Sequence, residues 1–521
     1  MNEFWLSGLL CACAGLTVGS YLGWQRGQAR WALGLLVGAA FALRLAMAGL
    51  DPFLHDWDER FHAVVARNLM TNPLLPLLRA HAALPYDYQA WCCNHVWMHK
   101  QPLFLWQMAL AMKVFGTNVL ALRLPSALLG SLLVYPIYRL GRLIYHDAAT
   151  GYLAAVLATF AFYSLEQTSG LIGMDHDDVA FTAYVGASIW AYYEYRASAR
   201  PGRWLVAVGV LAGAAVLCKW LTGLVVYAAW GLDILSDAAR RRAWRQYGQA
   251  ALSAAVATAV WLPWQLFTAW RYPLESAYER AYNTRHFSEA LEGHLHPWDY
   301  HFTLLPVHYG ALAWLLAAGG IWWLVADRHR PVLLLTAAVA VIYLFFTLAA
   351  TKMYSYVYVV SPLLFVLMAR PLAVAVTSLQ QRFRGRRWLS YGVLPALLLA
   401  VVLADARPWG IYTVHFEEGS YALHLSPLQR AARTANARLH EQLGHDIPAG
   451  YLIINASGDD EIQAMFHSGH DVYAWPPSEA QVQALVRRGW RLAAFESHHN
   501  QPLPGYVQAT PGFLPIWGVP Q

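Results

Sequence analysis

The acids and lysines at the ends of the apolar segments are the side chains most able to do chemistry. Asp56, Asp58 and Glu59 lie within four residues, just after an apolar segment that ends near residue 50. One carboxylate of this cluster could act as a general base. The cluster could equally be the ordinary start of a helix, where the helix dipole favours acids. It forms the first candidate site.

A second acid cluster, Met174-Asp175-His176-Asp177-Asp178, follows a later apolar segment. If both clusters reach the same surface, their carboxylates could bind a metal or a cationic group. Asp177 or Asp178 could instead cap the helix predicted to start at residue 178.

The chain has only four lysines, and each lies beside an apolar segment: Lys100, Lys113, Lys219 and Lys352. A lysine is a good point-charge partner for phosphate, so Lys100, Lys219 and Lys352 are candidate ligands of a phosphate group at the lipid surface. The alternative is a side chain that snorkels to the membrane surface, which is the interpretation for Lys113.

Histidines accompany these charges. His294 and His296 lie in the segment 271–304, which also holds Arg285, and His99 precedes Lys100. The histidines could ligate a metal together, but their spacing is not that of a zinc site, and single histidines more often only form hydrogen bonds. A divalent metal at His99 and His294 is therefore an alternative, and no cofactor is required.

The composition indicates what carries these groups. Of 521 residues, 58% are apolar and 13% are charged, whereas a soluble domain is about 25% charged. This excludes a cytosolic globular enzyme, a disordered protein and a nucleic-acid binder. Five cysteines are too few and too clustered for a disulfide framework. Twelve apolar spans are predicted, at roughly 4–22, 31–50, 121–143, 151–167, 178–195, 204–218, 220–235, 249–270, 305–325, 331–350, 354–370 and 388–404.

Charge asymmetry predicts the orientation of these spans. Alternate loops carry arginines, at 26 and 30, 139 and 142, 196–203, 240–245, 328 and 330, and 382–387. The positive-inside rule makes their face cytoplasmic. The opposite, outer face then holds the loops 51–120 and 271–304, with flat amphipathic helices predicted at 59–70 and 103–117.

The residues after about 405 have shorter apolar runs, a pattern that indicates alternating helices and strands. A helix is predicted from Ser426 to about Leu443, strands at 451–455 and 490–495, and a capped helix at 478–487. We therefore expect an all-α polytopic membrane protein of about twelve transmembrane helices plus interfacial helices. Residues 1–404 form its membrane domain, and 405–521 form a small α/β domain on the outer face.

Five motifs together resemble the class C integral-membrane glycosyltransferases, most closely the protein O-mannosyltransferase and lipid A aminoarabinose transferase group. They are Asp58-Glu59, His99-Lys100-Gln101-Pro102-Leu103 with Trp106, Phe115-Gly116 with Arg123-Leu-Pro-Ser-Ala127, Cys218-Lys219, and Thr351-Lys352 with Tyr354, Tyr356, Tyr358 and Pro362. Their order and spacing match over about residues 31–370. Gln101 and Trp220 depart from the family pattern, Trp220 by replacing a glycine.

The resemblance implies inverting transfer of a sugar from a polyprenyl-phosphate donor to a lipid, glycan or protein acceptor, on the periplasmic side of the inner membrane. By position, Asp58 is the candidate catalytic carboxylate, and Glu59 of the same motif is a further catalytic candidate. Asp175 is the second acid, with Asp178 as the competing match. Lys100, Lys219 and Lys352 would neutralise the leaving phosphate, with Arg285 a weaker candidate and Tyr356 part of the last motif.

Two other classes of function remain open at this point. A membrane transporter of a lipid-linked or anionic substrate also suits twelve spans, although transporters place ionisable groups near the midplane and contain internal repeats. An inactive partner subunit that binds through its tail is the third. It predicts that neutralising Asp58 changes no product.

Overall fold

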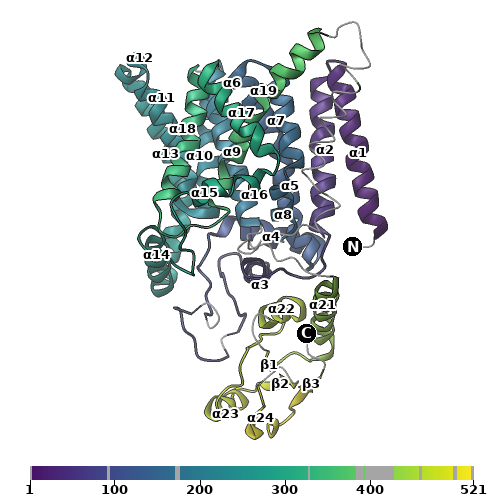
Figure 1. Ribbon diagram of the computed structural model, residues 1–521. Coiled ribbons are helices and arrows are strands. Elements are labelled where there is room, and N and C mark those ends of the chain that lie inside the picture. The colour runs from purple at the N-terminus through teal and green to yellow at the C-terminus, as the bar shows by residue number, and fades with distance from the viewer. Residues whose placement is uncertain are drawn as a thin grey trace.

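The computed structural model describes residues 3–81, 83–90, 94–170, 176–326, 329–382, 392, 427–456, 460–496 and 501–517. A bundle of long helices occupies one end of the molecule and a small sheet with helices the other (Figure 1). The helices before residue 390 are α1 Glu3–Gln25, α2 Ala29–Ala48, α3 Asp58–Leu69, α4 Pro102–Phe115, α5 Val119–Leu132, α6 Val134–Tyr145, α7 Ala148–Phe160, α8 Phe162–Ser169, α9 His176–Ala197, α10 Gly202–Lys219, η1 Trp220–Leu224, α11 Val225–Leu235, α12 Ala238–Arg242, α13 Trp244–Arg271, α14 Pro273–Ser288, α15 Tyr300–Thr303, α16 Leu305–Tyr309, α17 Leu312–Val325, α18 Arg330–Leu348, η2 Tyr356–Val360 and α19 Ser361–Arg382.

The described residues hold seven helical segments long and apolar enough to cross a membrane, or nine if each of two bent pairs is one span. The multi-pass helical architecture is confirmed, but the predicted number of twelve is not. One reason is α9, which carries four charged residues and is not among the candidates. The span predicted at 388–404 lies outside the described residues, apart from Gly392.

The longest candidate, Gly202–Leu235, reverses direction at η1. A straight helix of its 34 residues would be about 50 Å long. Arg196, just before this segment, and Arg240, just after it, both pair with Asp233. The start and the end of the segment therefore lie close together at one end of the bundle. Lys219, which directly precedes the turn, lies at the other end of the bundle.

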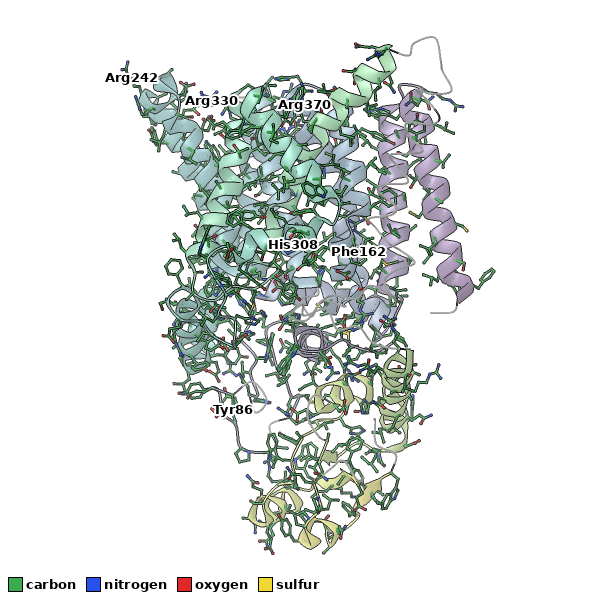
Figure 2. All side chains as sticks on the ribbon, viewed as in Figure 1. Tyr86, Phe162, Arg242, His308, Arg330 and Arg370 are labelled. Carbon is green, nitrogen blue, oxygen red and sulfur yellow. The ribbon has the colours of Figure 1, made fainter. Side chains whose placement is uncertain are left out.

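Arginines of several described loops lie together at one end of the bundle. Figure 2 labels Arg242, Arg330 and Arg370 at that end and Tyr86 at the other. The two amphipathic helices predicted in the outer loop are present as α3 and α4. In Figure 1 α3 is seen end-on, whereas α1 and α2 are seen from the side. This is the arrangement expected of a helix lying flat on a membrane surface.

Close helix packing uses small residues where the backbones cross. A Cβ atom added to Gly141 of α6 would lie 2.7 Å from the Cα of Gly151 of α7. Interfaces between membrane helices favour such residues because dispersion contacts replace the hydrophobic effect there.

The residues after 426 form α21 Pro427–Asp446, β1 Tyr451–Ile454, α22 Asp460–Ser468, α23 Glu479–Arg487, β2 Arg491–Phe495, α24 Gly505–Gln508 and β3 Leu514–Ile516. The three strands make a parallel sheet in the order β1-β2-β3, with Tyr451 opposite Arg491 and Ala493 opposite Leu514. The strands and helices predicted in this part are thus present. Its assignment as a separate outer domain stays a prediction.

This C-terminal part packs on the loop 51–120 rather than standing apart from it. Ala83 and Leu84 of the loop lie in the same buried cluster as Leu452 and Leu492 of the sheet. Arg79 donates to the carbonyl oxygen of Val472 at 3.1 Å and pairs with Glu461 at 3.2 Å. The loop and the tail therefore share one core.

Candidate active site

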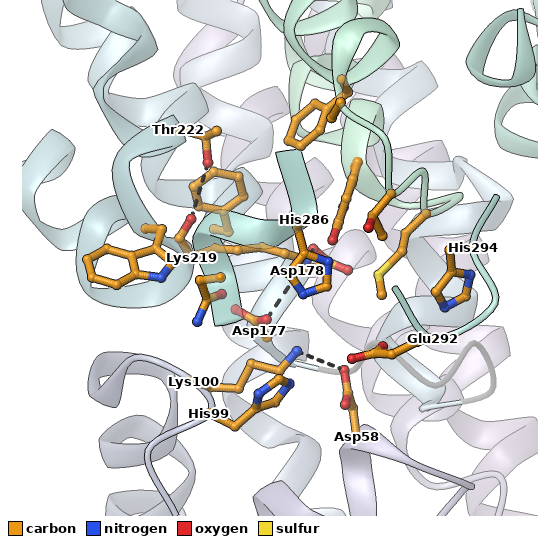
Figure 3. Close-up of a pocket in the computed structure, with 18 of the residues that line it drawn as sticks. Asp58, His99, Lys100, Asp177, Asp178, Lys219, Thr222, His286, Glu292 and His294 are labelled. Carbon is orange, nitrogen blue, oxygen red and sulfur yellow. Dashed lines mark hydrogen bonds and ion pairs between the residues drawn. The ribbon is translucent and has the colours of Figure 1, made fainter. Parts of the chain in front are cut away.

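The candidate site is a cavity of about 880 Å³ between the helical bundle and the outer loops (Figure 3). Its ionisable lining residues are Asp56, Asp58, His99, Lys100, Asp177, Asp178, Lys219, His286, Glu292 and His294, and its aromatic lining includes Trp57, Trp220, Phe345, Tyr354 and Tyr356. The two acid clusters and two of the four lysines, which lie far apart in sequence, thus meet in one space.

Helix ends position these charges. Asp58 is the first residue of α3, and Asp178 lies in the first turn of α9. Lys219 is the last residue of α10, and Lys100 directly precedes the N-cap of α4. Acids at helix N-termini and a lysine at a C-terminus are the placements that the helix dipole stabilises.

Two ion pairs cross the cavity. The Nζ atom of Lys100 lies 3.3 Å from Oδ2 of Asp58. Lys219 donates to Asp178 and lies 3.9 Å from Oδ2 of Asp177. The ammonium of Lys219 is also 5.4 Å from the centre of the Tyr356 ring, within reach of a cation–π contact. In Figure 3 the labelled side chains among these point into the same space.

The Asp58–Lys100 pair keeps both groups charged. Burial opposes ionisation of Asp58, but the positive charge of Lys100 outweighs it and lowers the pKa of Asp58 to about 2. Burial likewise opposes the ammonium, yet Asp58 and Asp177 raise the pKa of Lys100 well above its ordinary value. Asp58 is therefore an ionised carboxylate at neutral pH, the state that a general base requires.

This electrostatic coupling predicts the pH dependence of the site. Because the pKa of Asp58 is lowered, the carboxylate stays ionised until the pH falls towards about 2. We expect no inflection from Asp58 in a pH–rate profile between about pH 5 and 8. Lys100→Met removes the charge that lowers this pKa and should move the acidic inflection upward. An inflection near neutrality that Asp58→Asn abolishes would contradict the prediction.

One wall of the cavity is the segment 286–295, held against residues 349–352. The backbone N–H of Thr351 donates to the carbonyl oxygen of His286 at 3.0 Å, and that of Lys352 to His294 at 3.1 Å. The ammonium of Lys352 donates to the carbonyl oxygen of Ala349 at 2.7 Å and is not part of the lining. The Thr351-Lys352 motif thus supports the wall, and the structure does not bring Lys352 together with Lys100 and Lys219.

Glu59 lies next to Asp58 in sequence but not in the cavity. Its fully buried carboxylate accepts from Nε of Arg123 at 2.5 Å and from Nη2 at 2.8 Å. A Cβ atom on Gly170 would lie 2.5 Å from Glu59 Oε1, so the backbone closes over this pair. Glu59 and the Arg123 motif therefore form a structural ion pair behind the site.

Glu59→Gln should consequently act on stability. Removing one partner of a buried ion pair leaves an uncompensated charge and costs about 3–5 kcal/mol of unfolding free energy. Thermal unfolding of the detergent-purified variant measures this loss. A fully stable Glu59→Gln protein without transfer activity would instead give Glu59 a direct role in catalysis.

The remaining predicted residues divide between the cavity and its surroundings. Tyr356 lines the cavity. Arg285 is half exposed, pairs with Glu289 at 2.7 Å and lies outside the lining. Asp175 lies outside the described residues. Among the acids of its cluster, Asp177 and Asp178 both reach the cavity.

The described residues do not bring a group of metal-binding side chains together. His99 and His294 both line the cavity, and Nδ1 of His99 lies 3.3 Å from Oε2 of Glu279. No group of three or more His, Cys, Asp or Glu suited to a metal occurs within the described ranges. The divalent metal at His99 and His294 therefore stays a prediction, and no catalytic step is assigned to it.

Three residues at positive φ line the cavity. Trp57 has φ 61° and precedes Asp58, Trp220 has φ 64° and follows Lys219, and Glu292 has φ 55°. Trp220, with ψ −165°, occupies a region that is nearly restricted to glycine. Trp220, which replaces the glycine of the family motif, therefore keeps a backbone conformation typical of glycine and is strained. No sequence pattern pointed to the corresponding strain at Trp57.

A family model for dolichyl-phosphate-mannose-protein mannosyltransferases matches residues 99–267. An undecaprenyl phosphate-α-4-amino-4-deoxy-L-arabinose arabinosyl transferase of Pseudomonas paraeruginosa is 29% identical over 61% of this chain and 59% of its own length. The protein of the same name from Pseudomonas aeruginosa strain UCBPP-PA14 is 30% identical over 48% and 46%. The chain thus aligns with less than two thirds of either relative.

Two solved structures share the arrangement of helices. ArnT from Cupriavidus metallidurans bound to undecaprenyl phosphate gives a TM-score of 0.58 at 17% identity, over 84% of both chains. The oligosaccharyltransferase AglB from Archaeoglobus fulgidus gives 0.51 at 14% identity, over 85% of this chain and 64% of its own. The chain has the class C glycosyltransferase fold. The predicted resemblance to this class of multi-pass membrane proteins is confirmed.

Proposed function

We propose that the chain is a glycosyltransferase that moves a sugar from a polyprenyl-phosphate-linked donor to an acceptor. The observation that carries this proposal is the meeting of Lys100, Lys219 and the ionised Asp58 in one cavity. An ammonium has three donors, so each lysine can bind a phosphate oxygen while it keeps its carboxylate partner. The relatives named above act on a donor of this kind by their names.

The same geometry supports an inverting displacement. Asp58 accepts the proton of an acceptor hydroxyl, and the acceptor oxygen bonds to the anomeric carbon of the sugar. The bond from that carbon to the phosphate oxygen breaks, and the electron pair leaves with the polyprenyl phosphate. Lys100 and Lys219 stabilise the charge that develops on this leaving group. Lys352, Arg285 and Asp175 stay candidates from the family resemblance, and His99 with His294 from the metal alternative.

The side of the membrane follows from the charges. The start of α3 and the helix α14 line the cavity, and they lie at the end of the bundle opposite Arg242 and Arg330 (Figures 1 and 2). The positive-inside rule assigns the arginine-rich end to the cytoplasm. We therefore place the reaction at the periplasmic face of the inner membrane, where a lipid, glycan or protein acceptor is presented.

The carboxylates of the cavity guide the choice of donor. Asp58, Asp177, Asp178 and Glu292 outnumber the two lysines, even without Asp56, which is already paired with arginines. A sugar that carries an amino group would balance this excess of negative charge. The first donor to test is therefore the undecaprenyl phosphate-linked 4-amino-4-deoxy-L-arabinose of the relatives' name.

The test is transfer of label from purified polyprenyl-phosphate sugars into membrane acceptors by the full chain in liposomes. Label should leave the donor, and free polyprenyl phosphate should accumulate in equal amount. The labelled product then identifies the acceptor. A panel of neutral and amino sugar donors that gives no transfer, together with no donor binding, would overturn the proposal.

A further inference from the structure

One face of α21 contacts the loop 51–56, which leads to Asp58, through two ion pairs and one apolar contact. Arg430 pairs with Oδ1 of Asp51 at 2.8 Å, and Arg433 pairs with Oδ2 of Asp56 at 2.7 Å. One turn further along, Ala437 packs on Phe53 in a buried cluster of their own. Positions 430, 433 and 437 are spaced so that they share one side of a helix. The contact is therefore a continuous helix face.

The inner side of this loop is fixed as well. Arg123 of α5 donates to the carbonyl oxygens of Asp51 and Phe53, both at 3.0 Å. The backbone N–H of His55 donates to Glu59 at 2.6 Å. The segment 51–56 is thus held between the membrane bundle and the C-terminal part.

The residue between these anchors and the candidate base is strained. Trp57 has φ 61° and ψ −115°, and it is 63% exposed. Its own side chain buries too little surface to impose this backbone. Such a conformation persists only where the surroundings over-determine it. Asp56 supplies that constraint, since its carboxylate is shared by Arg433 and by Arg60 at 2.6 Å.

We propose that α21 is a positioning element of the active site, and that Arg433 and Arg430 set the direction in which Asp58 enters the cavity. The ion pairs fix Asp56 and Asp51, the backbone turns at Trp57, and Asp58 starts α3 facing Lys100. The two arginines touch no substrate. The expected effect on rate rests on the proposed function. The two ion pairs that hold the loop 51–56, called the clamp below, do not depend on that function.

The expected kinetic signature is a change in kcat. A small displacement of a catalytic group costs up to about 100-fold in rate. Arg433→Gln should lower kcat by about 10-fold or more, while the KM for the lipid-linked donor stays within about 2-fold of wild type. Arg433→Lys, which can still reach Asp56, should recover much of the loss. Arg438→Gln is the matched control, because Arg438 is exposed on the same helix.

A second measurement tests the clamp without any assay of transfer. Hydrogen–deuterium exchange of the backbone amides at 51–60 in the full chain should rise in Arg433→Gln and in Arg430→Gln, and stay at the wild-type level in Arg438→Gln. If exchange rises but no donor is ever used, the clamp is correct and the proposed function fails. If exchange and kcat of Arg433→Gln both match wild type, or if kcat falls only in proportion to the folded fraction, the inference is overturned.

Discussion

Asp58→Asn is expected to reduce sugar transfer by about 10²- to 10⁴-fold, the usual contribution of a general base. Asparagine keeps the shape of the side chain but cannot accept the proton of the acceptor hydroxyl. Asp58 is also the carboxylate of its cluster that is both ionised by Lys100 and open to the cavity. Initial rates of label transfer from the lipid-linked donor measure the effect.

The matched control is Asp87→Asn, an exposed acid of the same outer loop. It should leave transfer unchanged. The folded state of Asp58→Asn is checked by thermal unfolding, where only a small change is expected because Asp58 keeps partial contact with water, with 25% of its side chain exposed. Transfer that survives in a folded Asp58→Asn protein would remove Asp58 from the mechanism and point to Asp177 or Asp178.

The charged centre of this site was predictable from the sequence because charge near hydrocarbon is rare and costly. That argument selected Asp58, Lys100, Lys219 and Asp178, and all four line one cavity. The argument succeeded because each of these residues lies at or next to the end of a helix. The end of an apolar segment in the sequence therefore shows at which end of the bundle the residue lies. The same reasoning located the membrane helices but not their number, since a short apolar run does not reveal whether it spans.

The sequence could not show which of two neighbouring side chains faces the cavity. Glu59 follows Asp58 by one residue, which is about 100° around a helix, and this rotation turns it away from the cavity to Arg123. Lys352 satisfies the family motif, yet its ammonium ends on the carbonyl of Ala349. Which face of a helix is buried depends on partners that only the fold brings near.

Contacts over long sequence separations left no local pattern at all. Arg433 and Asp56 are 377 residues apart, and Arg430 and Asp51 are 379 apart. On the sequence alone these arginines belong to a polar helix of the tail. Ion pairs of this kind can be recognised only once the structure shows that the C-terminal part packs on the outer loop.

The second large effect is expected at Lys219. Lys219→Met removes a cation from the cavity and leaves Asp178, 6% exposed, without its closest partner. Breaking a buried pair in this way costs about 3–5 kcal/mol of unfolding free energy. Loss of a charge-assisted hydrogen bond to the donor phosphate costs about 1.5–3 kcal/mol of binding in addition, or about 10- to 150-fold in the KM for the donor. The single variant therefore mixes a folding defect with a binding defect.

The double variant Lys219→Met with Asp178→Asn separates the two. Neutralising both partners removes the uncompensated charge, so the thermal stability should return close to wild type. The KM for the donor should stay raised, because no cation has been restored to hold the phosphate. Lys113→Met, at an outer lysine that contacts the carbonyl of Met70 outside the cavity, should change neither property. If the double variant regains the wild-type KM, Lys219 is a structural partner of Asp178, and Lys100 is left as the cavity lysine available to the donor phosphate.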